Sequence, residues 1–220
     1  MINVLYDDEF IAVALKPSGF LSEGEGDDCF PAALRKALEE KHGKAITVFP
    51  VHRLDRATEG LMVYALTKDA AASLSEQITS GEWNKNYTAL LTKAPPKGAD
   101  TLCDLLYYDK TKGKSFVVKK ERKGVKSASL AYETVGIGAD GETVAVKVTL
   151  QTGRTHQIRV QFASRGMPLV GDRRYGAPAK FGNTLALCAT QLSFRQPKTN
   201  KEMSFSTQPS NFEYKTAPNL

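Results

Sequence analysis

Residues 115–150 contain three strand-like segments in succession, SFVVK (115–119), SLAYETV (129–135) and TVAVKVTL (143–150). Glycines punctuate the first part of this run, and residues 139–141, ADG, predict a turn before its last strand. Strands that follow one another across short turns pair antiparallel. The run therefore indicates a mainly antiparallel sheet.

Helical patterns lie on both sides of this run. Residues 31–42, PAALRKALEEKH, begin with a proline that suits a first helical position and end before Gly43. Residues 69–80, DAAASLSEQITS, also have a helical pattern and end before Gly81. A third helix is expected over residues 155–165, with Thr155 as its N-cap and Gly166 as its C-terminal cap.

Shorter apolar or alternating runs predict the remaining strands, within residues 2–15, 61–66 and 85–92 and from Leu185 onward. Together these elements predict an α+β protein with a mixed, mainly antiparallel sheet and flanking helices and loops. No linker clearly divides the chain, so we expect residues 1–220 to form a single domain.

The composition is that of a globular protein with a basic surface. A hydrophobic fraction of 41% excludes a largely disordered chain, and a net charge of +6 favours a polyanionic partner such as a nucleic acid. The three cysteines form no CxxC pair, and free thiols are typical of the reducing cytosol. The chain shows no signal peptide and no apolar run near the roughly 20 residues of a membrane helix. We therefore expect a monomeric, cytoplasmic protein without a membrane partner.

The stretch VHRLDRATEG (51–60) is a dense polar loop directly before a buried strand. Loops on a rigid scaffold often carry reactive groups. Arg53 and Arg56 flank Asp55, and either arginine could favour the charged form of this carboxylate. The composition of the loop alone favours an ordinary structural ion pair.

A second polar stretch, LQTGRTHQIR (150–159), runs from the end of a strand into a helix. It offers several donors within one turn: Arg154, His156, Gln157 and Arg159. Such a corner suits anion binding, although a solvated helix start is the commoner explanation for any single corner of this kind.

No motif for a nucleotide cofactor or a metal is evident. Residues 136–141 fit GxGxxG, but a strand follows them where a dinucleotide site needs a helix, so we interpret them as a hairpin turn. No Walker A sequence exists, and the histidines and cysteines have no metal-ligand spacing. We expect no cofactor and no metal.

Taken in order, four motifs resemble those of the RluA-type RNA pseudouridine synthases. HRLDRATEG (52–60) resembles the HRLD motif of that family. TGRTHQIR (152–159), followed by Gly171-Asp172 and Tyr175-Gly176, resembles its second signature. KPSG (16–19) and KNYTA (85–89) resemble two shorter motifs.

The resemblance implies an isomerase that converts uridine to pseudouridine in ribosomal or transfer RNA, with the catalytic-domain fold of the family. It places Asp55 on the catalytic aspartate, Tyr87 on the active-site tyrosine and Arg159 on the arginine that pairs with the aspartate. His52 and Arg53 fall on positions near the flipped-out nucleotide. The other RNA contacts that we expect are Arg56, Arg154, His156, Gln157, Lys119, Lys120 and Arg122.

Four positions depart from the family pattern, since Glu59, Gln161, Met167 and Cys188 stand where serine or histidine is common. None is the aspartate, the tyrosine or the arginine, so we expect them to affect the choice of RNA more than the chemistry. A separate N-terminal S4 RNA-binding domain is not expected, because only about 15 residues precede KPSG.

The reaction requires an extruded uridine and an ionised Asp55. Extrusion costs a few kcal/mol, and Arg53 could fill the gap that the base leaves or hold the displaced backbone. Asp55 could attack C1′ or C6, or assist deprotonation of the sugar. Arg159, if bidentate to Asp55, would orient the carboxylate. Tyr87 could stack on uracil or act as a base.

Two other functions share parts of this pattern. An RNA-binding protein of the same fold could have lost turnover, but the presence of Asp55, Tyr87 and Arg159 argues against that loss. A glycoside hydrolase could use Asp55 and Glu59 as paired carboxylates, although a four-residue spacing is more often incidental surface charge.

Residues 110–126, called the basic segment below, hold eight lysines and arginines and one acid, Glu121. Phe116, Val117 and Val118 interrupt the charges and predict a strand tied to the core. A solvated hairpin has the same pattern. An RNA enzyme without an accessory domain must hold its own substrate, so we expect this segment to dock RNA.

Overall fold

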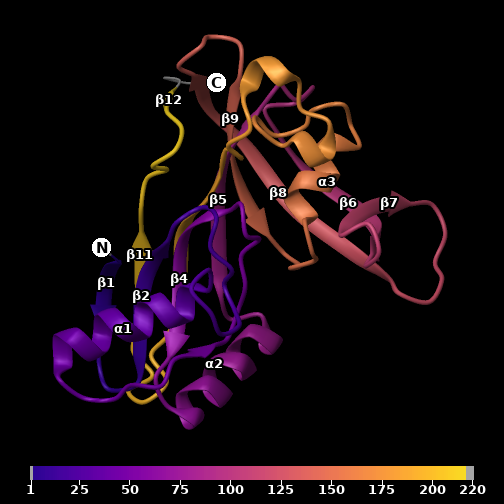
Figure 1. Cartoon of the computed structure of the whole chain (residues 1–220). Helices are drawn as coiled ribbons and strands as arrows, with labels where there is room; N and C mark the ends of the chain where they lie inside the picture. Colours follow the sequence, from indigo (N-terminus) through magenta and orange to yellow (C-terminus); the bar gives the residue numbers. More distant parts are fainter. Residues whose placement is uncertain (1, 217–220) are drawn as a thin grey trace. The chain divides into compact units, whose positions relative to one another are not determined.

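The computed structural model describes residues 2–216, and the chain forms two compact units. Unit 1 combines the N-terminal part of the chain up to Lys85 with Cys188–Gln208 (Figure 1). Unit 2 combines Asn86–Leu187 with the chain from Pro209 onward. Each unit is built around its own strands.

The strands of unit 1 follow the order β1-β2-β4-β10, with β3 also paired to β4 and β11 to β10. Their pairing is antiparallel except between β4 and β10, which run parallel. The bounds are β1 Asn3–Asp7, β2 Ile11–Lys16, β3 Phe49–Pro50, β4 Glu59–Ala65, β10 Leu187–Arg195 and β11 Glu202–Ser206. The parallel pairing of β4 with β10 makes the sheet mixed, as predicted.

Two helices belong to unit 1, α1 (Phe30–His42) and α2 (Lys68–Ser80). Each ends at a glycine in the left-handed conformation, Gly43 or Gly81, as the sequence predicts. Leu34 and Leu38 of α1 are fully buried, which contributes about 1.5–3 kcal/mol for each side chain. In α2 the buried Leu74 packs into a core of strand residues, among them Val13, Val63 and Phe194.

The strands of unit 2 follow the order β5-β9-β8-β6-β7, with β12 also paired to β8, and all of these pairs are antiparallel. The bounds are β5 Asn84–Leu91, β6 Ala99–Asp109, β7 Lys114–Val118, β8 Val125–Gly138, β9 Val144–Leu150 and β12 Tyr214–Thr216. The helical elements are α3 Gln157–Ala163 and the short 3-10 turns η1 Arg173–Tyr175 and η2 Ala179–Phe181. The turn at residues 139–141 joins β8 to β9, so the GxGxxG match is a hairpin as predicted.

Two local features differ from the sequence-based expectations. Strand β6 was not predicted, because its two buried residues, Leu102 and Leu106, are separated by exposed and half-buried positions. Thr155 is not the N-cap of α3: the cap is His156, in the left-handed conformation with φ 56°, and its side chain makes no capping hydrogen bond within the helix. Ser164 is the C-cap, and Gly166 adopts positive φ two residues later.

Among residues 2–216, no helix combines the length and the apolarity needed to cross a membrane.

Candidate active site and RNA-binding surface

Asp55 lies in unit 1, in the loop between β3 and β4. The backbone on both sides of it is held. The Ser22 hydroxyl donates to the carbonyl of Leu54 at 2.9 Å and accepts the N–H of Leu54 at 3.2 Å. The N–H of Thr58 donates to the carbonyl of Asp55 at 2.9 Å. Asp55 is therefore a half-buried residue in a turn whose backbone is held on both sides.

The KPSG segment is what supports this loop. Lys16 is 1% exposed, and its ammonium donates to the carbonyls of Pro17 (2.9 Å), Phe20 (2.9 Å) and Arg56 (3.3 Å). Burial lowers the pKa of Lys16 to about 8, and Asp55 and Glu59 oppose that shift electrostatically. In the sequence, Lys16 stood out only as part of a short motif. Its support of the Asp55 loop becomes evident only from its contact with the carbonyl of Arg56, 40 residues away.

The arginines that flank Asp55 have acidic partners elsewhere in unit 1. Arg53 lies 3.4 Å from Glu23, and Arg56 lies 3.3 Å from Asp28. Both arginines are more than half exposed, so these pairs contribute little stability and can exchange for phosphate. This exposure supports the RNA contacts predicted for them.

His52 is fixed to β4. Its Nε2 accepts the backbone N–H of Val63 at 3.1 Å, and its ring meets Trp83 edge-on with centroids 5.2 Å apart. Burial, with a smaller effect of Lys85, lowers the pKa of His52 well below its ordinary value. The ring is thus neutral with its hydrogen on Nδ1, which gives His52 a structural role beside the RNA contact predicted for it.

Two of the positions that depart from the family pattern are neighbours. Glu59 on β4 and Cys188 on β10 are register partners, and they are 6% and 1% exposed. Burial and, less strongly, Glu59 raise the pKa of the Cys188 thiol to about 12. The interpretation of Glu59 as incidental surface charge is therefore wrong, because this residue is buried.

The next register pair of these two strands is Gly60 and Ala189. A Cβ on Gly60 would lie 2.4 Å from the carbonyl oxygen of Ala189, so only glycine allows the strands to approach there.

In unit 2, Gln157 organises the TGRTHQIR corner from within. The side-chain oxygen accepts from the Thr152 hydroxyl at 2.8 Å and from the N–H of Arg154 at 3.0 Å, and its amide donates to the carbonyl of Ser129 at 3.1 Å. Gln157 is 3% exposed. Its burial assigns it to the scaffold of the corner, whereas the half-buried Arg154 remains at the surface.

Arg159 is buried at the start of α3 and forms a two-pronged ion pair with Asp172. Its Nε donates to Oδ2 at 2.7 Å and its Nη2 donates to Oδ1 at 2.8 Å. The sequence offered Asp172 only as part of the Gly171-Asp172 pair. Tyr87, the third predicted catalytic residue, is buried on β5 opposite Val148 of β9.

The basic segment spans the turn after β6, strand β7, the loop before β8 and the first two residues of β8 (Figure 1). Seven of its eight basic side chains are exposed, and Lys114 is half-buried. Val117 packs against the buried core of unit 2, as predicted, whereas Phe116 lies beneath the ammonium groups of Lys112 and Lys114. Arg122 stacks over Tyr107 at 4.8 Å. The segment is a positively charged surface on an anchored strand.

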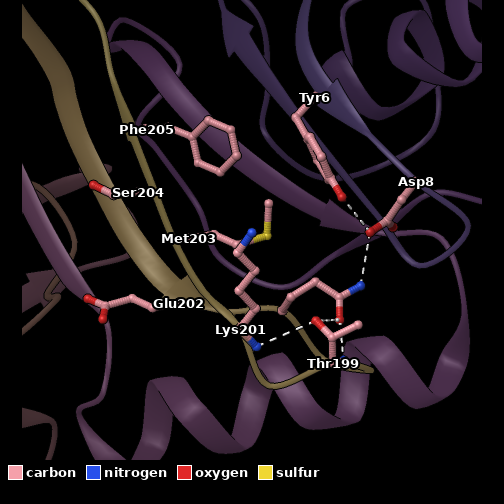
Figure 2. A pocket seen from close by; sticks show the side chains of 9 residues that line it. Tyr6, Asp8, Thr199, Lys201, Glu202, Met203, Ser204 and Phe205 are labelled. Carbon is pink, nitrogen blue, oxygen red and sulfur yellow. Dashed lines mark hydrogen bonds between the residues drawn. The ribbon is translucent and has the colours of Figure 1, made fainter.

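Unit 1 also contains a pocket (Figure 2). Strands β1 and β11 line it with Tyr6, Met203 and Phe205. Asp8 at its rim accepts hydrogen bonds from the Tyr6 hydroxyl and from Gln196, both at 2.9 Å. None of the predicted site residues lines this pocket.

Comparison with known proteins gives consistent results. The sequence model of a family described as RNA pseudouridylate synthase matches residues 11–164. The chain is 34% identical over 209 residues to the dual-specificity RNA pseudouridine synthase RluA of Pasteurella multocida, a match that covers 94% of this chain and 92% of the relative. It is 35% identical over 205 residues to the protein of the same name from Escherichia coli K12, covering 92% and 90%.

Solved structures show the same fold. Human RNA pseudouridylate synthase domain containing 1 matches with a TM-score of 0.79 and 22% identity, covering all of this chain and 91% of that one. Human RNA pseudouridylate synthase domain containing 4 matches with a TM-score of 0.77 and 23% identity, covering 95% and 89%. The predicted α+β fold is thereby confirmed.

Proposed function

Because this chain belongs to the RNA pseudouridylate synthase family, an isomerase family that converts uridine to pseudouridine, we propose that Asp55 is its catalytic carboxylate and that ribosomal and transfer RNA are its substrates. The observation that carries the first part is the bracing of the Asp55 loop. A buried lysine and a buried serine fix the backbone around one half-buried carboxylate in the motif that resembles HRLD. A reacting group must be held in this way to act at a defined atom of its substrate.

The roles of the other two residues follow from the family resemblance and from their surroundings. Arg159 serves as the cation that favours the ionised aspartate, and the Asp172 pair supports this role by fixing its guanidinium plane. Tyr87 packs beside the target base. Asp55 either attacks the nucleotide or assists deprotonation of the sugar, and the products are the same in each case.

The proposed RNA substrate rests on the names of the bacterial relatives and on the basic side chains of this chain. Both bacterial relatives are called dual-specificity enzymes, and we extend that breadth to ribosomal and transfer RNA for this chain. Arg53, Arg56, Arg154 and His156 contact the RNA near the target uridine, with a further contact from His52. Lys119, Lys120 and Arg122 of the basic segment hold its phosphates, which their exposure supports.

We also propose that the enzyme works in the cytoplasm, as a monomer and as one catalytic domain, without a cofactor. The isomerisation moves a base on its own sugar and needs no redox partner or energy source. Activity of the purified protein should therefore survive a chelator, apart from any effect on RNA folding.

Mapping of pseudouridines in total RNA tests the substrate assignment. RNA from cells with and without the gene should differ at defined uridines, in at least one ribosomal and one transfer RNA. The purified protein should restore those sites in RNA transcribed in vitro. Identical maps in the two strains, with no restoration, would contradict the proposal.

A further inference from the structure

The Tyr175 hydroxyl connects two parts of unit 2 that are far apart in the sequence, the basic segment and the TGRTHQIR corner. It accepts the backbone N–H of Ser115, within the basic segment, at 2.8 Å. It also lies 2.9 Å from Nδ1 of His156, in the TGRTHQIR corner. Tyr175 is 8% exposed, so both contacts are sheltered from water. One buried oxygen therefore joins the basic segment to the corner.

The backbone N–H of Ser115 can only donate, whereas the direction of the hydrogen bond between Tyr175 and His156 depends on which ring nitrogen of His156 carries the hydrogen. Burial raises the pKa of Tyr175 above its ordinary value of 10.0, so its hydroxyl stays protonated at neutral pH. Ser115 donates to the tyrosine oxygen, so the one hydroxyl proton remains to be donated, and His156 Nδ1 accepts it when the imidazole carries its hydrogen on Nε2. An imidazole that accepts at Nδ1 carries its hydrogen on Nε2 when neutral.

Further contacts make the connection rigid. The Ser115 hydroxyl donates to the carbonyl of Thr155 at 2.5 Å, and Arg174 donates to the carbonyl of Gly113. His156 itself has the positive φ of 56° that few residues other than glycine adopt, so its backbone needs support.

The tyrosine ring has cations near it as well. Lys114 lies 4.8 Å and Arg159 lies 5.1 Å from the ring centroid. The basic segment, the corner and the arginine proposed to act in catalysis thus meet at one side chain.

We propose that Tyr175 is a positioning residue: held by Ser115 of the basic segment, its hydroxyl fixes His156 as a hydrogen-bond donor through Nε2. RNA offers phosphate, ribose and base oxygens as hydrogen-bond acceptors. An N–H fixed as a donor pairs with these acceptors and not with the donor groups of the RNA. The RNA part of this inference rests on the proposed function, while the hydrogen-bond relay does not.

Nuclear magnetic resonance tests the relay directly, because the chain has only three histidines. Long-range proton–nitrogen spectra at about pH 8, above the ordinary histidine pKa of about 6.5, should show the His156 hydrogen on Nε2. In Tyr175→Phe a population with the hydrogen on Nδ1 should emerge. His52, which accepts from Val63 at Nε2, should keep its hydrogen on Nδ1 in both proteins. A His156 spectrum unchanged by the substitution would overturn the relay.

The matched control is Tyr108→Phe. The Tyr108 ring also meets His156 edge-on, with centroids 6.2 Å apart, but within residues 2–216 its hydroxyl makes no hydrogen bond to His156. Tyr175→Phe should lower kcat/KM on ribosomal or transfer RNA on the order of tenfold, the effect of one hydrogen bond. Tyr108→Phe should stay near the parent value. The salt dependence of binding should not change in either variant, since every lysine and arginine remains.

A purely structural role for Tyr175 gives a different result. It would lower the melting temperature of Tyr175→Phe while the folded variant kept the parental kcat/KM, and that outcome would overturn the positioning role. If the parent protein formed no pseudouridine in either RNA, the proposed function would fail, yet the histidine spectra would still decide the relay.

Discussion

Arg159 and Asp172 form a buried, two-pronged ion pair, with donor–acceptor distances of 2.7 and 2.8 Å. The two side chains are 8% and 1% exposed. The pair ties the first turn of α3 to the segment that leads into η1. Its geometry uses the planar fork of a guanidinium, which a lysine ammonium cannot reproduce.

Arg159→Lys should therefore change both stability and activity. Losing one prong of a buried pair should lower the unfolding free energy by about 2 kcal/mol, as measured by urea denaturation. The kcat of the folded variant should also fall, because the guanidinium plane is proposed to favour the ionised Asp55.

Arg165→Lys provides the control. Arg165 also contacts a carboxylate with two prongs, Asp104, but its side chain is 32% exposed. Its replacement should lower the unfolding free energy by less than about 1 kcal/mol. Equal losses in the two variants would show that burial of the Arg159 pair is not what matters.

The basic segment should contribute to RNA affinity through phosphate contacts. Each contact to single-stranded RNA steepens the slope of log affinity against log salt by about 0.7. Replacing Lys119, Lys120 and Arg122 with alanine should weaken binding and flatten that slope by up to roughly 2. The rate of the chemical step at saturating RNA should change little, because these side chains are not assigned to the reacting base.

A second triple variant removes the same charge elsewhere. Arg35, Lys36 and Lys44 are exposed on or just after α1, in unit 1. Replacing them with alanine should leave the salt slope near the parental value. Equal slopes for the parent and the basic-segment variant would show that the segment serves solubility alone.

Lys16 should make folding stability depend on pH. Its pKa is lowered from 10.5 to about 8 in the folded protein, so between these values the unfolded chain binds more protons. Stability should therefore rise with pH over this window. The unfolding free energy of the parent minus that of Lys16→Met should increase by about 3 kcal/mol at most between pH 8 and 10.5. A difference that stays flat across the window would mean that Lys16 has an ordinary pKa when folded.

Sequence patterns predicted those elements whose burial is periodic or whose ends have their own signals. The helices α1 and α2 begin and end close to the predicted residues, since proline and glycine mark local backbone geometry. Strand β6 escaped notice because only Leu102 and Leu106 are buried along it, a spacing of four that helices share. Thr155 was wrongly expected as a cap: the left-handed His156 takes that position, and its ring contacts Tyr175, 19 residues away.

In the candidate site, too, local sequence motifs indicated some residues, while residues that act through distant contacts were not indicated. Motifs led us to propose Asp55, Tyr87 and Arg159 as site residues, but they did not indicate which residues hold the surrounding loops. Lys16 contacts the carbonyl of Arg56, 40 residues away, and Asp172 lies 13 residues beyond Arg159. Such partners come together only when the chain folds, so local spacing cannot indicate them. The burial of Gln157 and Glu59 was hidden for the same reason.

The most direct test of the central claim measures release of tritium from RNA that carries uridine labelled at C5, because formation of the new C5–C1′ bond expels that hydrogen. Asp55→Asn should fold with a parental melting temperature and release no tritium above background. Asp69→Asn, on the exposed face of α2, should release it at the parental rate. Turnover by Asp55→Asn near the parental rate would contradict the assignment of Asp55 as the catalytic carboxylate.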